Sequence, residues 1–74
     1  MLIPELNAQY TFDQLMNFGV RSDEKGEYVA AIASLDQAVE LKPNDDMAWL
    51  TRGVVRVHMK DYGSAVVDFN KAIL

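Results

Sequence analysis

The apolar residues of this 74-residue chain recur at spacings of three and four, which is the period of an amphipathic α-helix. The first pattern covers 12–25, and its apolar members are Phe12, Leu15, Met16 and Phe18. Thr11 and Gln14 have the spacing of a capping box, which satisfies free backbone amides at a helix start. We therefore expect a first helix that begins at about residue 12.

Three further helical segments follow, separated by residues typical of helix ends. Gly26 supplies the left-handed conformation of a helix stop. The apolar positions of the second helix are Tyr28, Ala31, Ile32, Leu35, Ala38 and Val39. Pro43 cannot continue a helix, and the acidic residues behind it can cap a third helix over about 46–59. A turn at Lys60 then leads to a fourth helix with Asp61 as its expected cap, so the sequence predicts two helical hairpins.

The second half of the chain repeats the first with a shift of 34 residues, the separation of Tyr28 and Tyr62. The register holds without a gap, and other identical pairs are Gly19 and Gly53, Ala31 and Ala65, and Ala38 and Ala72. Glycine and alanine have almost no side chain, so two helices can approach closely at these positions. A period of this length indicates one helical hairpin that buries its apolar face on the next.

The motifs of both copies resemble the tetratricopeptide repeat. The second copy contains Trp49, Arg52, Gly53, Tyr62, Ala65 and Phe69, and the first contains Leu15, Phe18, Gly19, Gly26, Tyr28, Ala31, Leu35, Ala38 and Pro43. The resemblance implies an all-α superhelix of two tandem helix-turn-helix hairpins, with repeats at 12–45 and 46–74 after an N-terminal extension at 1–11. The residues that it assigns to repeat packing are Gly19, Tyr28, Ala31, Leu35, Ala38, Pro43, Trp49, Gly53, Tyr62, Ala65, Phe69 and Ala72.

Two differences between the copies carry further expectations. Lys60 stands where the first copy has Gly26, so we expect Lys60 to be strained if its backbone is left-handed. Arg52 and Asp68 replace an uncharged pair of the first copy, Phe18 and Ser34. Because both positions change together, we expect a salt bridge between the third and fourth helices, although two unrelated surface charges are the alternative.

The resemblance also implies a concave groove lined by the first helix of each hairpin. The matching residues are Asp13, Met16, Asn17, Val20, Asp23, Glu24, Met47, Leu50, Thr51, Val54, Val57 and His58. Six of them are apolar, which favours an amphipathic helix or an apolar peptide as partner. An acidic tail is not expected, because Met16 and Val20 stand where relatives that clamp carboxylates have Lys and Asn. Ordinary core packing is the other interpretation of the apolar strip.

Composition narrows the partners and the compartment. The net charge is −4 with a pI of about 4.6, and the basic residues are scattered, so nucleic acid is not an expected partner. There is no cysteine for a disulfide or a thiolate metal site. The opening residues 1–6 have no basic region and reach a proline at Pro4, which indicates neither a secretory signal nor a membrane span. We expect a soluble cytoplasmic protein.

Candidate chemistry is sparse. His58 is the single histidine, and no nucleophile is paired with it in the sequence. The acidic run at 44–46 lacks the spacing of an EF-hand loop and is better explained as helix capping. The glycines are dispersed and form no phosphate loop. The sequence therefore predicts a protein-binding module that is not an enzyme and needs neither cofactor nor metal.

Size raises the question of self-association. Repeat hairpins bury their faces on neighbours, and about three are usually needed for stability. Val67 and Ile73 of the last helix require cover, so we expect a homo-oligomer. The alternative is a purely structural oligomerisation unit, or a fragment of a longer repeat array, with no separate ligand. Within the chain, the N-terminal residues Leu2, Ile3, Leu6 and Tyr10 either fold back across the groove or extend the first helix.

Overall fold

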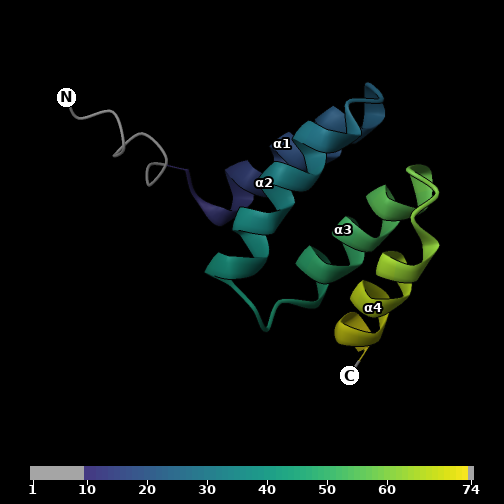
Figure 1. Cartoon of the computed structure of the whole chain (residues 1–74). Helices are drawn as coiled ribbons and strands as arrows, with labels where there is room; N and C mark the ends of the chain where they lie inside the picture. The colour runs from purple at the N-terminus through teal and green to yellow at the C-terminus, as the bar shows by residue number, and fades with distance from the viewer. Residues whose placement is uncertain (1–9, 74) are drawn as a thin grey trace.

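The computed structural model describes residues 10–73, and within them it contains four helices and no strand (Figure 1). The helices are α1 (Phe12–Glu24), α2 (Tyr28–Leu41), α3 (Asp46–His58) and α4 (Tyr62–Ile73). The predicted all-α fold of two helical hairpins is confirmed, with helix ends within one or two residues of those expected. None of the helices in 10–73 has both the length and the apolar character needed to cross a bilayer.

The helix starts are held by the side chains that the sequence indicated. The Thr11 hydroxyl accepts a hydrogen bond from the Gln14 amide at 3.1 Å, and the Gln14 side chain accepts one from the Thr11 amide at 2.9 Å. This is a complete capping box. At α3, the Asp45 carboxylate accepts from the Met47 amide at 2.9 Å. Both caps satisfy amides that have no partner within their helix.

The two hairpin turns have the same backbone geometry. After α1, the amides of Gly26 and Glu27 donate to the carbonyls of Asp23 and Ser22, which is a Schellman motif. After α3, the amides of Lys60 and Asp61 donate to the matching carbonyls, Val57 and Arg56. Gly26 has φ +78° and Lys60 has φ +65°. The left-handed backbone on which the expected strain at Lys60 depends is present, and Lys60 is the one non-glycine residue with positive φ among residues 10–73.

Each hairpin closes on a glycine. A Cβ atom placed on Gly19 of α1 would lie 2.6 Å from the Leu35 side chain of α2. One placed on Gly53 of α3 would lie 2.5 Å from the Phe69 ring of α4. Real Cβ atoms are almost never this close to a neighbour, so both helix pairs approach to a distance that only glycine permits.

The core lies where α1, α2 and α3 meet. Its two clusters are Leu15, Ala38, Val39 and Ala48, and Ala31, Leu35 and Val55. All of these side chains are at most 5% exposed. Because most of them are small, the three helices pack closely and little apolar volume is enclosed.

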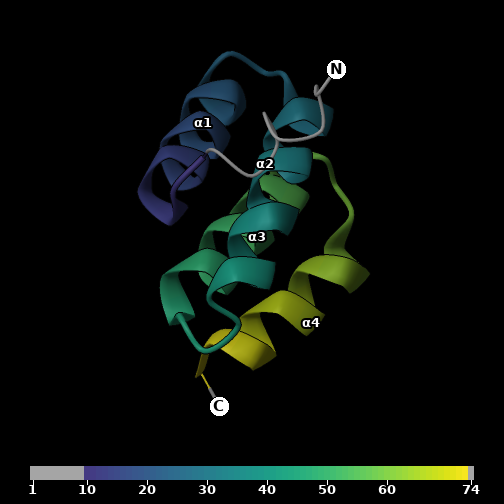
Figure 2. The same cartoon turned by 90° about the vertical axis from the view of Figure 1, so that its left-hand side faces the viewer.

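The hairpins stack through α2 and α3 (Figures 1 and 2). Within residues 10–73, α4 packs against α3 alone, whereas α2 contacts both α1 and α3. Figure 2 shows α1 and α4 at opposite sides of the molecule. Two residues of the predicted packing set, Pro43 and Tyr62, are exposed. Tyr62 is 58% exposed because, within residues 10–73, no helix covers α4 in the way that α3 covers α2.

The N-terminal segment can be followed only from Tyr10. The Tyr10 ring meets the Phe18 ring edge to face, with 5.3 Å between their centroids. Tyr10 and Thr11 precede α1 and are not helical, so α1 is not extended across them. Leu2, Ile3 and Leu6, which were expected to cover the groove or lengthen the helix, lie outside the described residues.

We expect Lys60→Gly to stabilise the protein. Glycine removes the steric cost of a left-handed side-chain-bearing residue, which is about 1 kcal/mol. Thermal unfolding followed by circular dichroism should show a melting temperature higher by roughly 4–8 °C. Gly26→Lys places the same strain in the first turn and should lower it. An unchanged or lower melting temperature for Lys60→Gly would refute the strain argument.

We expect Gly53→Ala to destabilise the protein by about 1–3 kcal/mol, because the added methyl group must displace the Phe69 ring. Gly63→Ala is the matched control, since a Cβ atom at Gly63 meets nothing within 4 Å. Urea unfolding measures both. Alanine has the higher helix propensity, so Gly63→Ala should keep or raise the stability. A Gly53→Ala protein that is as stable as the wild type, or more stable, would contradict the close-approach argument.

Candidate functional site

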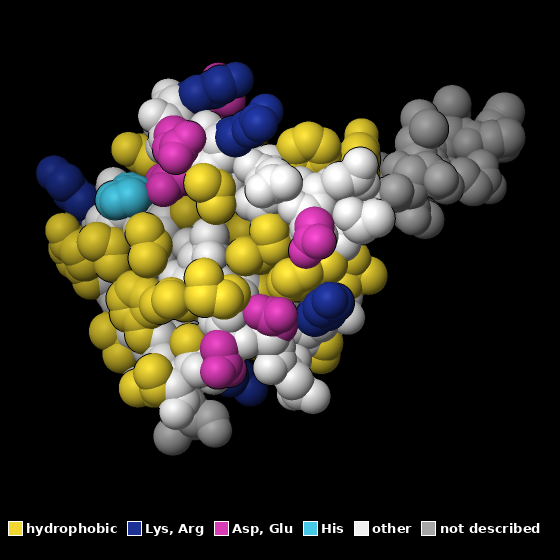
Figure 3. All heavy atoms as spheres, turned by 180° about the vertical axis from the view of Figure 1, so that it is seen from behind, with side chains coloured by type: hydrophobic (Ala, Val, Ile, Leu, Met, Phe, Trp, Pro, Cys, Tyr) yellow, Lys and Arg dark blue, Asp and Glu magenta, His cyan; other side chains and the backbone are white. Residues whose placement is uncertain are grey.

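The residues predicted to line the groove lie on α1 and α3, at spacings that place them on one side of each helix. We call this surface the α1/α3 face. Its exposed apolar residues are Val20, Met47, Leu50, Val54 and Val57, which are 36–57% exposed. Figure 3 views the molecule from behind Figure 1 and shows hydrophobic side chains gathered in a broad patch, with the histidine near its margin.

The other predicted residues differ in how far they reach solvent. Asp13, Asn17 and Glu24 are exposed, and Thr51 is half-buried. Met16 is also half-buried and packs against both core clusters. Met16 therefore serves the core as well as the surface, whereas the five exposed apolar residues are the part of the face that is open to a partner.

His58 and Asp23 join the two helices at the margin of the face. His58 Nδ1 lies 2.8 Å from Asp23 Oδ1 and 3.0 Å from Oδ2, which is hydrogen-bond distance to that carboxylate. The Asp23 side chain is 14% exposed and that of His58 is 46% exposed. The Tyr28 ring lies 6.1 Å from the imidazole. The sequence placed both residues in the groove set but did not predict that they are bonded to each other.

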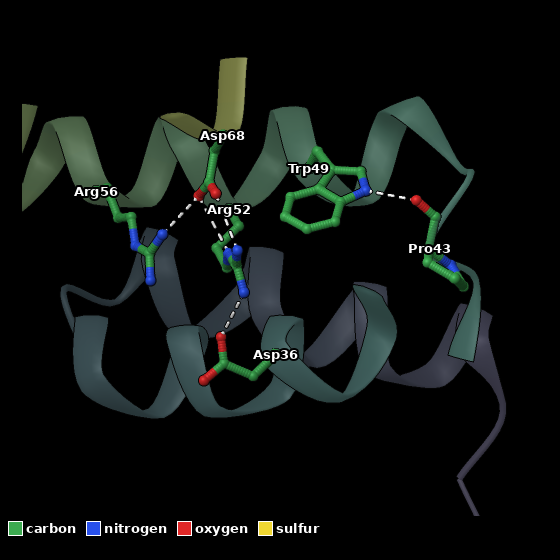
Figure 4. Close-up of polar contacts among 6 residues, drawn as sticks. All are labelled: Asp36, Pro43, Trp49, Arg52, Arg56 and Asp68. Carbon is green, nitrogen blue, oxygen red and sulfur yellow. Dashed lines mark hydrogen bonds and ion pairs between the residues drawn. The ribbon is translucent and has the colours of Figure 1, made fainter. Parts of the chain in front are cut away.

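The opposite side of α3 carries a polar network (Figure 4). The Arg52 guanidinium donates through Nε and Nη2 to both oxygens of Asp68, at 3.0 and 2.9 Å. The expected bridge between α3 and α4 is thus confirmed and is bidentate, a geometry that makes charged hydrogen bonds strong. Asp68 is fully buried, so this is a core interaction rather than a surface pair.

Two members of the network were not predicted from the sequence. Arg56 donates to Asp68 at 3.0 Å, and Arg52 Nη1 donates to Asp36 of α2 at 2.8 Å. Arg56 follows Arg52 by four residues on one side of α3, which was a usable signal for the first contact. Hydrogen bonding to Asp68 is the main cause that raises the pKa of Arg52, so this guanidinium remains charged at physiological pH.

Trp49 lies beside the network. Its Nε1 donates to the Pro43 carbonyl at 2.7 Å, and both Arg52 and Lys71 lie within cation–π distance of its ring. Two open hollows of about 490 and 480 Å³ flank this tryptophan. They are lined by side chains of both charges, including Arg56, Asp36 and Lys71, and of these Asp36 pairs with Arg52 and Arg56 pairs with Asp68.

Among residues 10–73, no group of three or more histidine, cysteine or acidic side chains is placed to hold a metal ion. The described hydrogen bonds of His58 reach only Asp23 and no hydroxyl group. The arrangement offers apolar contact area on one side and a neutralised ion network on the other.

Comparison with known proteins finds one partial similarity to report. A stretch of 46 residues, 62% of this chain, is 35% identical to Protein SGT1 homolog from Homo sapiens. The stretch makes up 13% of that relative, so the chain spans a small part of its length. No family model matches the chain, and no solved structure matches it.

We expect Asp68→Asn to lower the free energy of unfolding by about 3 kcal/mol, because it leaves two arginines without their buried counter-charge. Asp36→Asn is the matched control and should cost about 0–1 kcal/mol, since the Asp36 side chain is 49% exposed. A double-mutant cycle on Arg52 and Asp68 by urea unfolding gives the coupling directly. Zero coupling would show that the two charges do not stabilise each other.

Proposed function

We propose that this chain is a non-enzymatic protein-interaction module of the tetratricopeptide-repeat type, which binds an amphipathic helix or an apolar peptide on its α1/α3 face. The observation that carries the proposal is the exposure of five apolar side chains on that one face. Scattered exposed apolar residues are ordinary, but a contiguous set at helical spacing is a surface that a partner can cover.

The repeat assignment rests on the chain itself. The 34-residue period places Gly19 and Gly53 at matching helix contacts, and it places Gly26 and Lys60 at matching left-handed turns. Packing contacts and turn geometry thus follow the same period as the sequence. This agreement supports two equivalent hairpins, which is the architecture that the motifs imply.

The pattern of the face suggests the shape of the partner. Met47, Leu50, Val54 and Val57 form a row along α3 with spacings of three and four. A helical partner with apolar residues at positions i, i+3, i+4 and i+7 can place a matching row against it, while Val20 of α1 forms the second wall. Asp13 and Glu24 are exposed on the same side of α1, so basic residues flanking the partner's apolar row would be favoured.

We propose no catalytic role. His58 Nδ1 is hydrogen-bonded to Asp23 across two helices, an arrangement that fixes the margin of the face, and the described hydrogen bonds of His58 include no nucleophile to activate. The surrounding apolar residues offer no polar group at which a reacting atom would be held.

Self-association is the second candidate. A second copy that covers the α1/α3 face would use the same apolar residues, and the chain would then be a structural unit without a separate ligand. The matched stretch of 46 residues makes up 13% of a longer protein, which also supports a unit that is one part of a longer chain. Sedimentation velocity separates these cases from a free adaptor.

If the α1/α3 face serves a separate ligand and not the homo-oligomer expected from the sequence, wild-type protein should sediment as a monomer independent of concentration. It should then bind a synthetic amphipathic helix of about 18 residues with leucine on one face and lysine on the other. Titration of 15N-labelled protein should shift the amides of α1 and α3. Leu50→Asp should weaken binding about tenfold or more, because it places a charge in the apolar contact.

Val29→Asp is the matched control, since Val29 is 79% exposed on α2, away from the face. It should leave the affinity unchanged. A dimer that Leu50→Asp dissociates and Val29→Asp does not would replace the adaptor by the structural alternative. Peptide binding that ignores Leu50→Asp would contradict the proposed face.

A further inference from the structure

A second apolar surface lies on α4, beside the residues that α4 buries against α3. Its members are Tyr62, Val66 and Ile73, which are 58%, 55% and 79% exposed. We call it the α4 face. It shares no residue with the α1/α3 face, and within residues 10–73 α4 contacts α3 but neither α1 nor α2.

The repeat shows what such a surface does when it is covered. The residues 34 positions earlier are Tyr28, Ile32 and Val39 of α2. Val39 is 5% exposed and belongs to a core cluster, and Tyr28 and Ile32 are half-buried against the other cluster. The difference from α4 has a simple cause, since α2 is packed against both α1 and α3, whereas within residues 10–73 α4 is packed against α3 alone.

Two residues of α3 make that cover possible. Ala48 and Val55 are 0% and 1% exposed and complete the two core clusters with residues of α2. They stand seven residues apart, and Arg52 lies between them with its Nη1 2.8 Å from Asp36 of α2. The helix that covers α2 therefore presents three side chains along one side, which are an alanine, a valine and a cation between them.

A second copy of this chain cannot supply the same line to the α4 face. Its α3 already buries Ala48 and Val55. Its α1 has Gln14 and Arg21 at the equivalent positions, and both are exposed in this structure. Docking α1 on α4 in the repeat geometry would bury an amide and an unpaired guanidinium in an apolar contact, which is costly.

The α4 face also differs from α2 in charge. Asn70 stands 34 residues after Asp36 and is exposed. A cation at the centre of a covering helix would therefore lose its solvation without meeting a carboxylate, whereas a neutral polar side chain can hydrogen-bond the amide. The α4 face therefore disfavours arginine at the position of the covering helix that is equivalent to Arg52, whereas α2 favours arginine there.

We propose that the α4 face binds an amphipathic helix of another polypeptide in the manner in which α3 covers α2, and that this helix carries small apolar residues seven positions apart with a neutral polar residue between them. This surface acts independently of the α1/α3 face. The bound helix would take the place on α4 that α3 has on α2.

The probe is a synthetic peptide of residues 44–60 of this chain that carries Arg52→Gln, added to 15N-labelled full-length protein at up to about 1 mM. It should shift amides of α4 around Val66, Asn70 and Ile73. Val66→Asp in the protein should abolish these shifts, whereas Val20→Asp, on the α1/α3 face, should leave them unchanged. A peptide that also carries Ala48→Asp and Val55→Asp should not bind.

Position 52 of the peptide gives a second test, because a nonspecific apolar contact would not depend on the charge at that position. The peptide with Arg52 retained should bind wild-type protein about threefold to tenfold more weakly than the Gln peptide, and Asn70→Asp should reverse the order. The proposal is overturned if the α4 amides do not shift, or if the two peptides rank in the same order of affinity on both proteins. It is also overturned if the α4 amides shift with protein concentration alone, because that would identify a second copy as the occupant.

Discussion

The close approach of helices at Gly19 and Gly53 is the constraint on which the rest of the structure depends. At both positions the space of a single methyl group is already taken by the side chain of the facing helix. The two core clusters of alanine, valine and leucine then fill the junction of α1, α2 and α3, so the interior is dense but small. A chain of this size that encloses so little apolar volume must leave larger apolar side chains outside, and these form the two faces.

The two apolar faces and the ion network divide the surface between them. The α1/α3 face belongs to both hairpins, and His58 ties its margin to Asp23. The α4 face belongs to the second hairpin alone. Between them, Arg52 and Arg56 bind the buried carboxylate of Asp68, and Arg52 also binds Asp36, so the two cations on the far side of α3 are balanced by two carboxylates. The charged groups of this network thus hold the helices together, whereas the apolar side chains of the two faces remain exposed.

Much of the fold could be predicted from the sequence, because the decisive signals are local. Capping residues, Gly26 and Pro43 mark the helix ends, and the shared period marks the hairpins. Comparison of the copies also predicted the Arg52 and Asp68 bridge, since both residues belong to one repeat. The contact of Arg52 with Asp36 joins different repeats, and a comparison of equivalent positions carries no information about such pairs. The bond between His58 and Asp23 was missed for the same reason, and periodicity could assign residues to a face but not the occupant of that face.

Arg52 has a consequence for how the molecule comes apart. Its guanidinium holds a residue of α2 and a residue of α4 at once, so separation of the two hairpins breaks its bond to Asp36, and opening of the second hairpin breaks its bonds to Asp68. In a stack of repeats, the coupling between neighbours decides whether units melt singly or together. This one side chain therefore favours a single cooperative transition, and it makes the boundary between the hairpins a poor place for independent motion.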